Sequence, residues 1–244
     1  MERPEVLVRD SFQQAWKDAV SLLIQSGGEW RNLVVQICKP DHFDDGFHAA
    51  CDNFSAQQGL LGPKHVAYTI FPRRLASRHR DITKLSYEYN RPRGFYDRVA
   101  RRAHRWGTYF QRMTAYPNPG GGVVNQLERI IGAIKSRRAV HKAAYTIVIP
   151  RPGAETAQPL GAPCLNYVAV QLEAGDPKHL GLLAVYRNHD FLERAYGNYW
   201  GLCNLLLYLA QETGAAPGPL TCVSSHAYIP NHRRALGELI RSLP

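Results

Sequence analysis

The sequence predicts a mixed α+β domain in which a sheet packs against one long buried helix. The chain has 244 residues, of which 45% are hydrophobic, and this is enough for one large core. Apolar runs of strand length alternate with segments of helical periodicity, and residues 191–211 form a long apolar helical segment. We find neither an internal repeat nor a linker in the sequence, so we expect residues 1–244 to form a single domain.

The first elements follow from capping residues and apolar periodicity. Their expected order is a strand at 6–9, a helix between Asp10 and Gly27, a strand at 32–38 and a helix near 44–56. Asp10 is the expected N-cap, because an apolar stripe at helical spacing follows it, and Gly27 and Gly28 would end the helix. The rest of the range 40–92 predicts an irregular basic segment.

The later elements have clearer signals. The Pro-Asn-Pro-Gly-Gly-Gly stretch at 117–122 predicts a loop, and the apolar residues that follow it recur at helical spacing. The expected elements are mixed helical character at 95–113, a helix at 124–134, strands at 143–149, 165–172 and 180–186, the helix at 191–211, a strand at 220–229 and a short final helix.

The charge balance favours an anionic ligand. Lys and Arg total 30 against 20 Asp and Glu, which gives a formal net charge of +10. Many of the arginines lie between Arg73 and Arg112, where nucleic acid or a small phosphate could bind, although a solvated basic face explains the cluster equally well. No recognition motif beyond charge supports nucleic acid, so we do not expect it as a partner.

Several classes of protein are not supported. No apolar run reaches the length of about 18 residues that a membrane span needs, and residues 1–9 have no apolar core of a secretory signal. The five cysteines are widely spaced and form no Cys-x-x-Cys pair, so zinc and redox motifs are not indicated. Reduced thiols in the cytoplasm are the simplest expectation. We expect Cys38, Cys203 and Cys222 to lie in the core.

Cys164 is the candidate nucleophile. A lone buried cysteine usually acts as a small hydrophobic residue, but Cys164 follows Pro163 at a predicted junction of loop and strand. Several arginines lie near it in the sequence, and positive neighbours lower a thiol pKa and raise the thiolate fraction. We therefore expect a reactive thiolate at this position.

Three arginines could hold a phosphate. Arg137 and Arg138 follow a predicted helix, and Arg187 lies at the end of a predicted strand. A guanidinium group matches the oxygens of a phosphate, so two adjacent arginines could enclose one. The alternative for Arg137 and Arg138 is a favourable interaction with the helix dipole.

Polar side chains in the last third of the chain could contact a base and a sugar. Asn198 lies in an otherwise apolar helix, and its amide could pair either with a pyrimidine edge or with a structural partner. His226 and Tyr228 alternate on one predicted strand, so both should point to the same face, where they could contact a sugar hydroxyl.

These residues together resemble the thymidylate synthase superfamily. The resemblance runs in order through Asn125-Gln126-Leu127, Ser136-Arg137-Arg138, Pro163-Cys164-Leu165, Arg187-Asn188-His189-Asp190, Asn198 and His226-Ala227-Tyr228. It covers residues 109–229 and is loose over 40–108. The N-terminal strand and the Ala15-Trp16-Lys17-Asp18-Ala19 segment look like the shorter archaeal-type members and the nucleotide hydroxymethylases. The resemblance implies a thymidylate synthase-like fold and a homodimer that associates through its sheets.

The resemblance also implies a role for each residue. Cys164 would attack C6 of a pyrimidine nucleoside monophosphate and make C5 nucleophilic, and methylenetetrahydrofolate would donate one carbon. Hydride transfer from the folate would then give a methyl product, and water addition a hydroxymethyl product. The implied contacts are Arg187 and Asn188 to the phosphate, Arg137 and Arg138 to the same phosphate across the dimer, Asn198 to the base, His226 and Tyr228 to the ribose and Asp190 to the pterin.

Some positions depart from the family pattern. Asn188 stands where a serine is usual, and Glu88 is the best match to an upstream catalytic glutamate. The sequence ends at Pro244, soon after Tyr228, which favours hydroxymethylation or a specialised substrate. Asn198 favours uracil, because hydroxymethylases that act on deoxycytidylate usually carry an acid there. Alternative functions are a nucleotide- or nucleic-acid-binding protein on the same fold, or the same C5 activation on an unusual acceptor.

Overall fold

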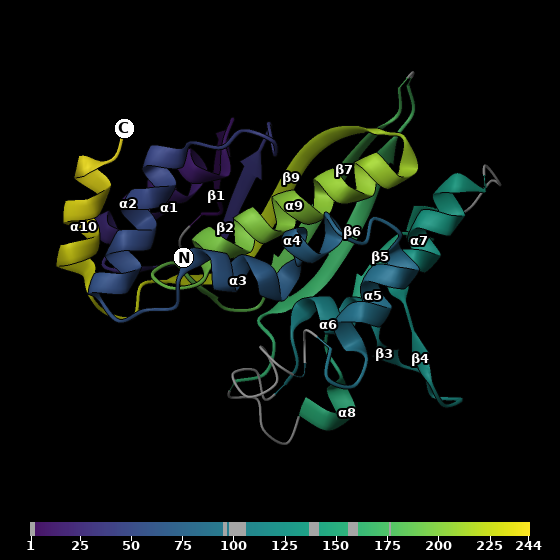
Figure 1. The fold of residues 1–244 in the computed structure, drawn as a ribbon. Coiled ribbons are helices and arrows are strands. Elements are labelled where there is room, and N and C mark those ends of the chain that lie inside the picture. Colours follow the sequence, from purple (N-terminus) through teal and green to yellow (C-terminus); the bar gives the residue numbers. More distant parts are fainter. Residues whose placement is uncertain (1–2, 95–96, 98–105, 137–141, 156–160, 176) are drawn as a thin grey trace.

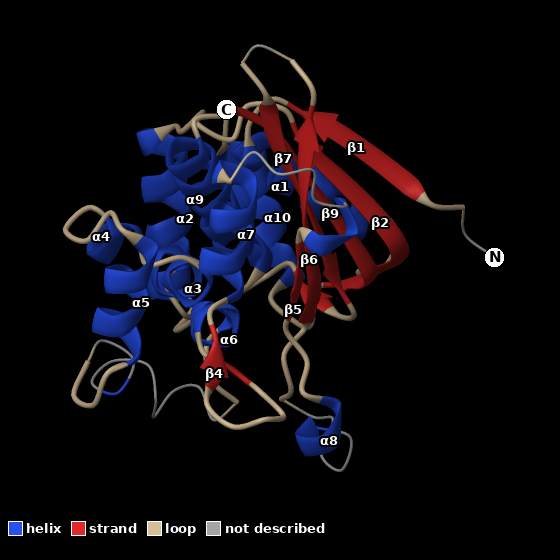
Figure 2. Ribbon diagram, turned by 90° about the vertical axis from the view of Figure 1, so that its right-hand side faces the viewer, coloured by secondary structure: helices blue, strands red, loops and turns tan. Residues whose placement is uncertain are grey.

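A seven-stranded mixed sheet with helices gathered on one face forms the centre of the fold (Figures 1 and 2). The computed structural model describes residues 3–94, 97, 106–136, 142–155, 161–175 and 177–244. This architecture confirms the predicted mixed α+β class. Within the described ranges, no helix has both the length and the apolar character needed to cross a bilayer.

The sheet combines parallel and antiparallel pairs in the order β1-β2-β9-β7-β6-β5, with β8 beside β9. Its strands are β1 (Glu5–Arg9), β2 (Glu29–Ile37), β5 (Thr146–Val148), β6 (Leu165–Glu173), β7 (His179–Tyr186), β8 (His189–Asp190) and β9 (Ala216–Tyr228). The β1/β2, β7/β9 and β8/β9 pairs are parallel, and the others are antiparallel. A separate hairpin joins β3 (Tyr116–Pro117) to β4 (Val123–Val124).

The helix α9 (Ala195–Thr213) is the long buried helix that the sequence predicts, and it packs against β7 and β9. The left-handed residue Gly214 ends it. The other helices are α1 (Phe12–Gln25), α2 (Asp45–Gln57), α3 (Pro63–Ile70), α4 (Arg73–Ala76), α5 (Ile82–Asn90), α6 (Tyr109–Thr114), α7 (Gln126–Lys135), α8 (Pro152–Glu155), α10 (Arg233–Ser242) and the 3₁₀ turn η2 (Lys142–Ala144).

Glycines bring α3 and α9 into close contact. A Cβ atom at Gly197 would lie 2.5 Å from Val66 Cβ, and one at Gly201 would lie 2.8 Å from the Ala67 carbonyl oxygen. The distance between two helices depends on the side chains between them, so these glycines permit a near approach of the backbones.

Strand directions bring the predicted site residues to one end of the sheet. Leu165 at the start of β6 pairs with Tyr186 at the end of β7, and Tyr186 pairs with Ser224 of the parallel strand β9. Three residues further along, β8 pairs with the last residues of β9. The segment before β6, the segment after β7 and the last residues of β9 therefore lie close together.

Three predictions about local structure are wrong. The N-cap of α1 is Ser11, whose hydroxyl accepts the Gln14 N–H, and not Asp10. Cys38 follows the last residue of β2 and is exposed, whereas Cys203 and Cys222 are buried as expected. The range 40–92 holds the ordered helices α3, α4 and α5 rather than an irregular segment.

Candidate functional site

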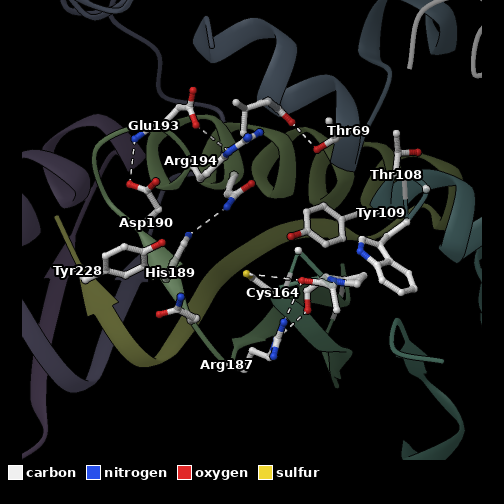
Figure 3. Close-up of a pocket in the computed structure, with 18 residues that line it drawn as sticks. Thr69, Thr108, Tyr109, Cys164, Arg187, His189, Asp190, Glu193, Arg194 and Tyr228 are labelled. Atoms are coloured by element: carbon white, nitrogen blue, oxygen red, sulfur yellow. Dashed lines mark hydrogen bonds and ion pairs between the residues drawn. The ribbon is translucent and has the colours of Figure 1, made fainter. Parts of the chain in front are cut away.

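A cavity of about 860 Å³ opens at this end of the sheet, within the size range of small-molecule sites (Figure 3). It brings together six of the ten residues that the sequence nominated. These are Cys164, Arg187, Asn188, Asp190, Asn198 and Tyr228. The other residues of the wall are Val66, Thr69, Trp106, Gly107, Thr108, Tyr109, Gly161, Ala162, Pro163, His189, Glu193 and Arg194.

Cys164 stands immediately before β6, as the sequence predicts, and is half-buried. The prediction that its pKa is lowered is wrong. Burial raises the pKa of the Cys164 thiol, and the positive charges of Arg187 and Arg194 offset this only in part. The thiol is therefore mainly protonated at neutral pH, and arginines control how much thiolate forms.

Alkylation of Cys164 by iodoacetamide should therefore accelerate with pH well into the alkaline range. The Arg187→Gln variant removes a positive charge that lowers the thiol pKa, so its rate profile should move to higher pH. Mass spectrometry of the Cys164 peptide measures the rate at this thiol alone. A rate that reaches its plateau below neutral pH would contradict the raised pKa.

Arg187 holds the loop that carries the cysteine. Its Nε donates to the Pro163 carbonyl at 3.2 Å and its Nη2 to the Ala162 carbonyl at 3.0 Å. The backbone N–H of Arg187 also donates to the Cys164 carbonyl at 2.9 Å. The guanidinium lines the cavity, so one cation both fixes the loop and contributes positive charge to the site.

His226 and Tyr228 do share one face, with parallel rings whose centroids are 5.4 Å apart. Tyr228 lines the cavity, whereas His226 stands behind Asn188 and outside the described wall. His226 Nδ1 lies 2.8 Å from Asn188 Oδ1, and its Nε2 lies 3.0 Å from the Glu29 carboxylate. The interaction with His226 lowers the pKa of Glu29. His226 thus orients Asn188 and is itself held by Glu29.

Asp190 stabilises the turn before α9. Its Oδ1 accepts the backbone N–H groups of Leu192 at 2.8 Å and Glu193 at 3.1 Å. Burial raises the pKa of Asp190 despite these two bonds. Glu193 reaches across to accept the Leu61 N–H at 2.9 Å and pairs with Arg194 at 3.3 Å. This part of the wall therefore contains two carboxylates and a cation.

Asn198 enters the cavity wall from the first turn of α9. Its Nδ2 lies 3.1 Å from His189 Nε2, and His189 Nδ1 lies 2.9 Å from Ser224 Oγ. All three side chains are at most 3% exposed. Burial lowers the pKa of His189 to about 3, so its imidazole is neutral.

Tyr109 is a site residue that our sequence reasoning missed. Its hydroxyl accepts the Leu165 N–H at 3.4 Å, and in Figure 3 it points toward the same space as the Cys164 sulfur. Burial raises the pKa of Tyr109 to about 12, so the hydroxyl keeps its proton. The structure shows Thr108 as the N-cap of α6, and a tyrosine directly after such a residue was the available signal, which is a weak one.

Arg112 supports the wall from behind, although the sequence placed it in the basic segment. Its side chain is 2% exposed and pairs with the Glu155 carboxylate. It also donates to the Ile149 carbonyl at 2.9 Å and, from Nε and Nη2, to the Trp106 carbonyl at 2.9 and 2.5 Å. The buried Arg112 guanidinium therefore links the part of the cavity wall at Trp106 to Glu155 of α8.

Of the remaining nominated residues, Glu88 and His226 belong to the described part of the chain, and neither lines the cavity. Glu88 is on α5, where its carboxylate pairs with Arg91 at 2.8 Å and forms no part of the described wall. Arg137 and Arg138 lie outside the described residues. Arg73, Arg74, Arg78 and Arg80 are exposed, as a solvated basic face would be.

Comparison with known proteins gives partial matches to archaeal proteins. No family model matches the chain. Proteins named "putative thymidylate synthase" from Methanococcoides burtonii and Methanosarcina mazei are each 30% identical over 125 residues, which are 51% of this chain and 53% of theirs. A protein of the same name from Methanosarcina barkeri is 27% identical over a stretch of equal length. The chain thus spans about half the length of the curated relatives it matches. These similarities, with the mixed α+β fold, support a relationship of the chain to thymidylate synthase-like proteins.

Proposed function

We propose that the chain transfers a one-carbon unit from methylenetetrahydrofolate to C5 of a pyrimidine nucleoside monophosphate. The observation that carries this proposal is the convergence of Cys164, Arg187 and Asn198 on one cavity. A nucleophile, a phosphate-binding cation and an amide for a base edge are the groups that such chemistry requires. A single domain spanning residues 1–244 would hold the whole of this cavity.

The nucleotide would bind with its base near Asn198 and its phosphate near Arg187. Asn188 and Tyr228 would contact the ribose and phosphate side of the ligand, and His226 would act by holding Asn188 in place. Because the chain has a formal net charge of +10 and Arg187 adds a cation to the wall, a dianionic phosphate is the expected anchor.

Cys164 would add to C6 as the thiolate. The covalent adduct would make C5 nucleophilic, and C5 would then bond to the one-carbon unit. Loss of the C5 proton would break the bond between that carbon and the folate nitrogen, and the thiolate would leave when hydride or water adds to the carbon. Tyr109 stands beside Cys164 with its proton retained, so it can donate a hydrogen bond while charge moves through the ring. Arg187 stabilises the thiolate when it forms and when it departs.

The cavity suits a second ligand beside the nucleotide. Its volume is in the upper part of the range for small-molecule sites, and Asp190 offers a carboxylate that could accept pterin N–H groups. Methylenetetrahydrofolate would supply the carbon, and either its hydride or water would complete the product. Arg194, whose charge acts on the Asp190 carboxylate, would line the same part of the cavity.

Release of tritium from C5 tests the proposal directly. The wild-type chain should release tritium from at least one of 5-tritiated dUMP, UMP, dCMP and CMP, and methylenetetrahydrofolate should increase turnover. Release reports addition at C6, because only the adduct exposes the C5 proton to exchange. If none of the four nucleotides releases tritium, the chain does not perform this chemistry.

We also propose a homodimer that forms through the sheet. A row of apolar side chains crosses four strands on the face away from the helices, where Val6 pairs with Val34, Val34 with Val223 and Val223 with Val185. Val6 is 58% exposed. Association of two such faces would bury the row and could carry Arg137 and Arg138 to the partner's cavity.

Hybrid dimers should show whether these arginines act across the interface. The Cys164→Ala chain and the Arg137→Ala/Arg138→Ala chain should each be inactive alone. Mixed in equal amounts, they should recover about a quarter of wild-type activity, because half of the dimers contain one complete site of two. Val223→Lys, which places a charge in the row, should give monomers by sedimentation. No recovery in mixtures that do form hybrid dimers would show that both arginines act within their own chain.

A further inference from the structure

Three buried side chains form one chain of hydrogen bonds, Ser224–His189–Asn198, of which His189 and Asn198 belong to the cavity wall. Within the described part of the protein, His189 is the side-chain hydrogen-bond partner of both Asn198 and Ser224. Burial keeps the imidazole neutral, so it carries a proton on one nitrogen only. The ring itself is held by parallel stacking on Tyr186, with centroids 3.9 Å apart.

The position of that proton and the orientation of the Asn198 amide depend on each other. An amide nitrogen only donates, so the observed contact of Asn198 Nδ2 with His189 Nε2 places the imidazole proton on Nδ1. Nδ1 then donates to Ser224 Oγ. If the amide rotates by half a turn, its oxygen requires a proton on Nε2, and the Ser224 hydroxyl then donates to Nδ1.

Both arrangements satisfy the imidazole and the side of the amide that faces it, because the Ser224 hydroxyl can donate or accept. A backbone N–H or carbonyl in the place of Ser224 would permit only one of them. In the two arrangements, the donor nitrogen and the acceptor oxygen of the Asn198 amide exchange positions toward the cavity. Uracil offers an N3–H donor and an O4 acceptor, whereas cytosine offers an N3 acceptor and an N4 amino donor, so each arrangement matches one base.

We infer that this chain of hydrogen bonds lets one site accept both uracil and cytosine nucleotides, with the His189 tautomer changing with the base. The inference rests on the proposed function, in which Asn198 pairs with the base edge. His189 and Ser224 are then positioning residues, because they set the orientation of the Asn198 amide that pairs with the base.

Binding and nitrogen NMR test the inference without turnover. Calorimetry with dUMP and with dCMP should give dissociation constants within about tenfold of each other for the wild-type chain. In protein labelled with ¹⁵N-histidine, the protonated nitrogen of His189 should differ between the two complexes. The His189→Phe variant assigns the signal. The same tautomer in both complexes would overturn the inference.

Ser224→Ala should convert the site to a selective one. Without the hydroxyl, a proton on Nδ1 would be a buried donor with no acceptor, so the imidazole should keep its proton on Nε2. One base edge is then disfavoured, and the ratio of the two dissociation constants should change by about tenfold or more. Ser225→Ala, the exposed neighbour on β9, is the matched control and should leave the ratio unchanged. If Ser224→Ala weakened the binding of both nucleotides equally, Ser224 would have only a structural role, and this result would contradict the inference.

Failure of the inference can be separated from failure of the proposed function. Tight binding of only one base would exclude dual recognition while leaving the nucleotide site intact. Binding of neither dUMP nor dCMP, nor of UMP or CMP, would remove the nucleotide site itself and with it both proposals.

Discussion

Replacement of Cys164 by alanine is expected to lower tritium release from C5 by at least about 10³-fold. The reason is that C5 becomes acidic only after a nucleophile adds to C6, and the Cys164 sulfur is the nucleophile exposed to the cavity. Nucleotide binding should survive, since the alanine leaves Arg187 and Asn198 in place. Release assays and calorimetry on the same preparation separate the two effects.

Cys38→Ala is the matched control for this experiment. Cys38 is an exposed thiol that does not belong to the cavity wall, so its loss should not change release. Wild-type chain should also form a mass adduct with 5-fluoro-dUMP, and the Cys164→Ala chain should not. Release that persists in the Cys164→Ala variant would assign the chemistry to another group and exclude the proposed adduct.

Arg112→Ala should lower the free energy of unfolding by about 3–5 kcal/mol, because it leaves the buried Glu155 charge without its partner. The Trp106 and Ile149 carbonyls would lose their donors at the same time. Activity should fall too, since Trp106 belongs to the cavity wall. Urea unfolding monitored by circular dichroism measures the loss.

Two further variants make the Arg112 result specific. Arg91→Ala breaks the half-exposed pair with Glu88 and should cost less than about 1 kcal/mol. The double variant Arg112→Met/Glu155→Leu removes both buried charges and should recover part of the loss. A small effect of Arg112→Ala, similar to that of Arg91→Ala, would show that the buried pair contributes little to folding.

The sequence predicts the elements whose signals are local. The helix at 191–211, the strands near 165 and 180 and the loop at 117–122 follow from apolar runs and from glycine and proline, and all are present. The unpredicted helices α3, α4 and α5 are short, at 4–9 residues, so little periodicity marks them. Their order comes from packing against α9 and its neighbours, which a single sequence does not display.

The site residues likewise include some that a local sequence signal marks and others that only tertiary contacts reveal. Cys164 and Arg187 are polar residues at strand boundaries, where the antiparallel pairing of β6 with β7 brings them together. The raised thiol pKa could not be predicted, because burial outweighs the arginine charges and depends on tertiary contacts. His189, Ser224 and Arg112 are buried polar residues whose partners are far away in the sequence, so nothing local distinguishes them from solvated side chains.

The close contact of α3 with α9 gives the cavity one unyielding side. Val66 and Thr69 of α3 and Asn198 of α9 line the cavity, and at Gly197 and Gly201 α9 contributes no side chain that could change rotamer where it contacts α3. A larger or smaller ligand therefore cannot be accommodated by adjusting that gap. Changes of substrate size, whether in natural variants or by engineering, should appear in other parts of the wall, such as the place where Trp106 faces Gly161. Random libraries would then be most productive at those two positions, and least productive at the helix glycines.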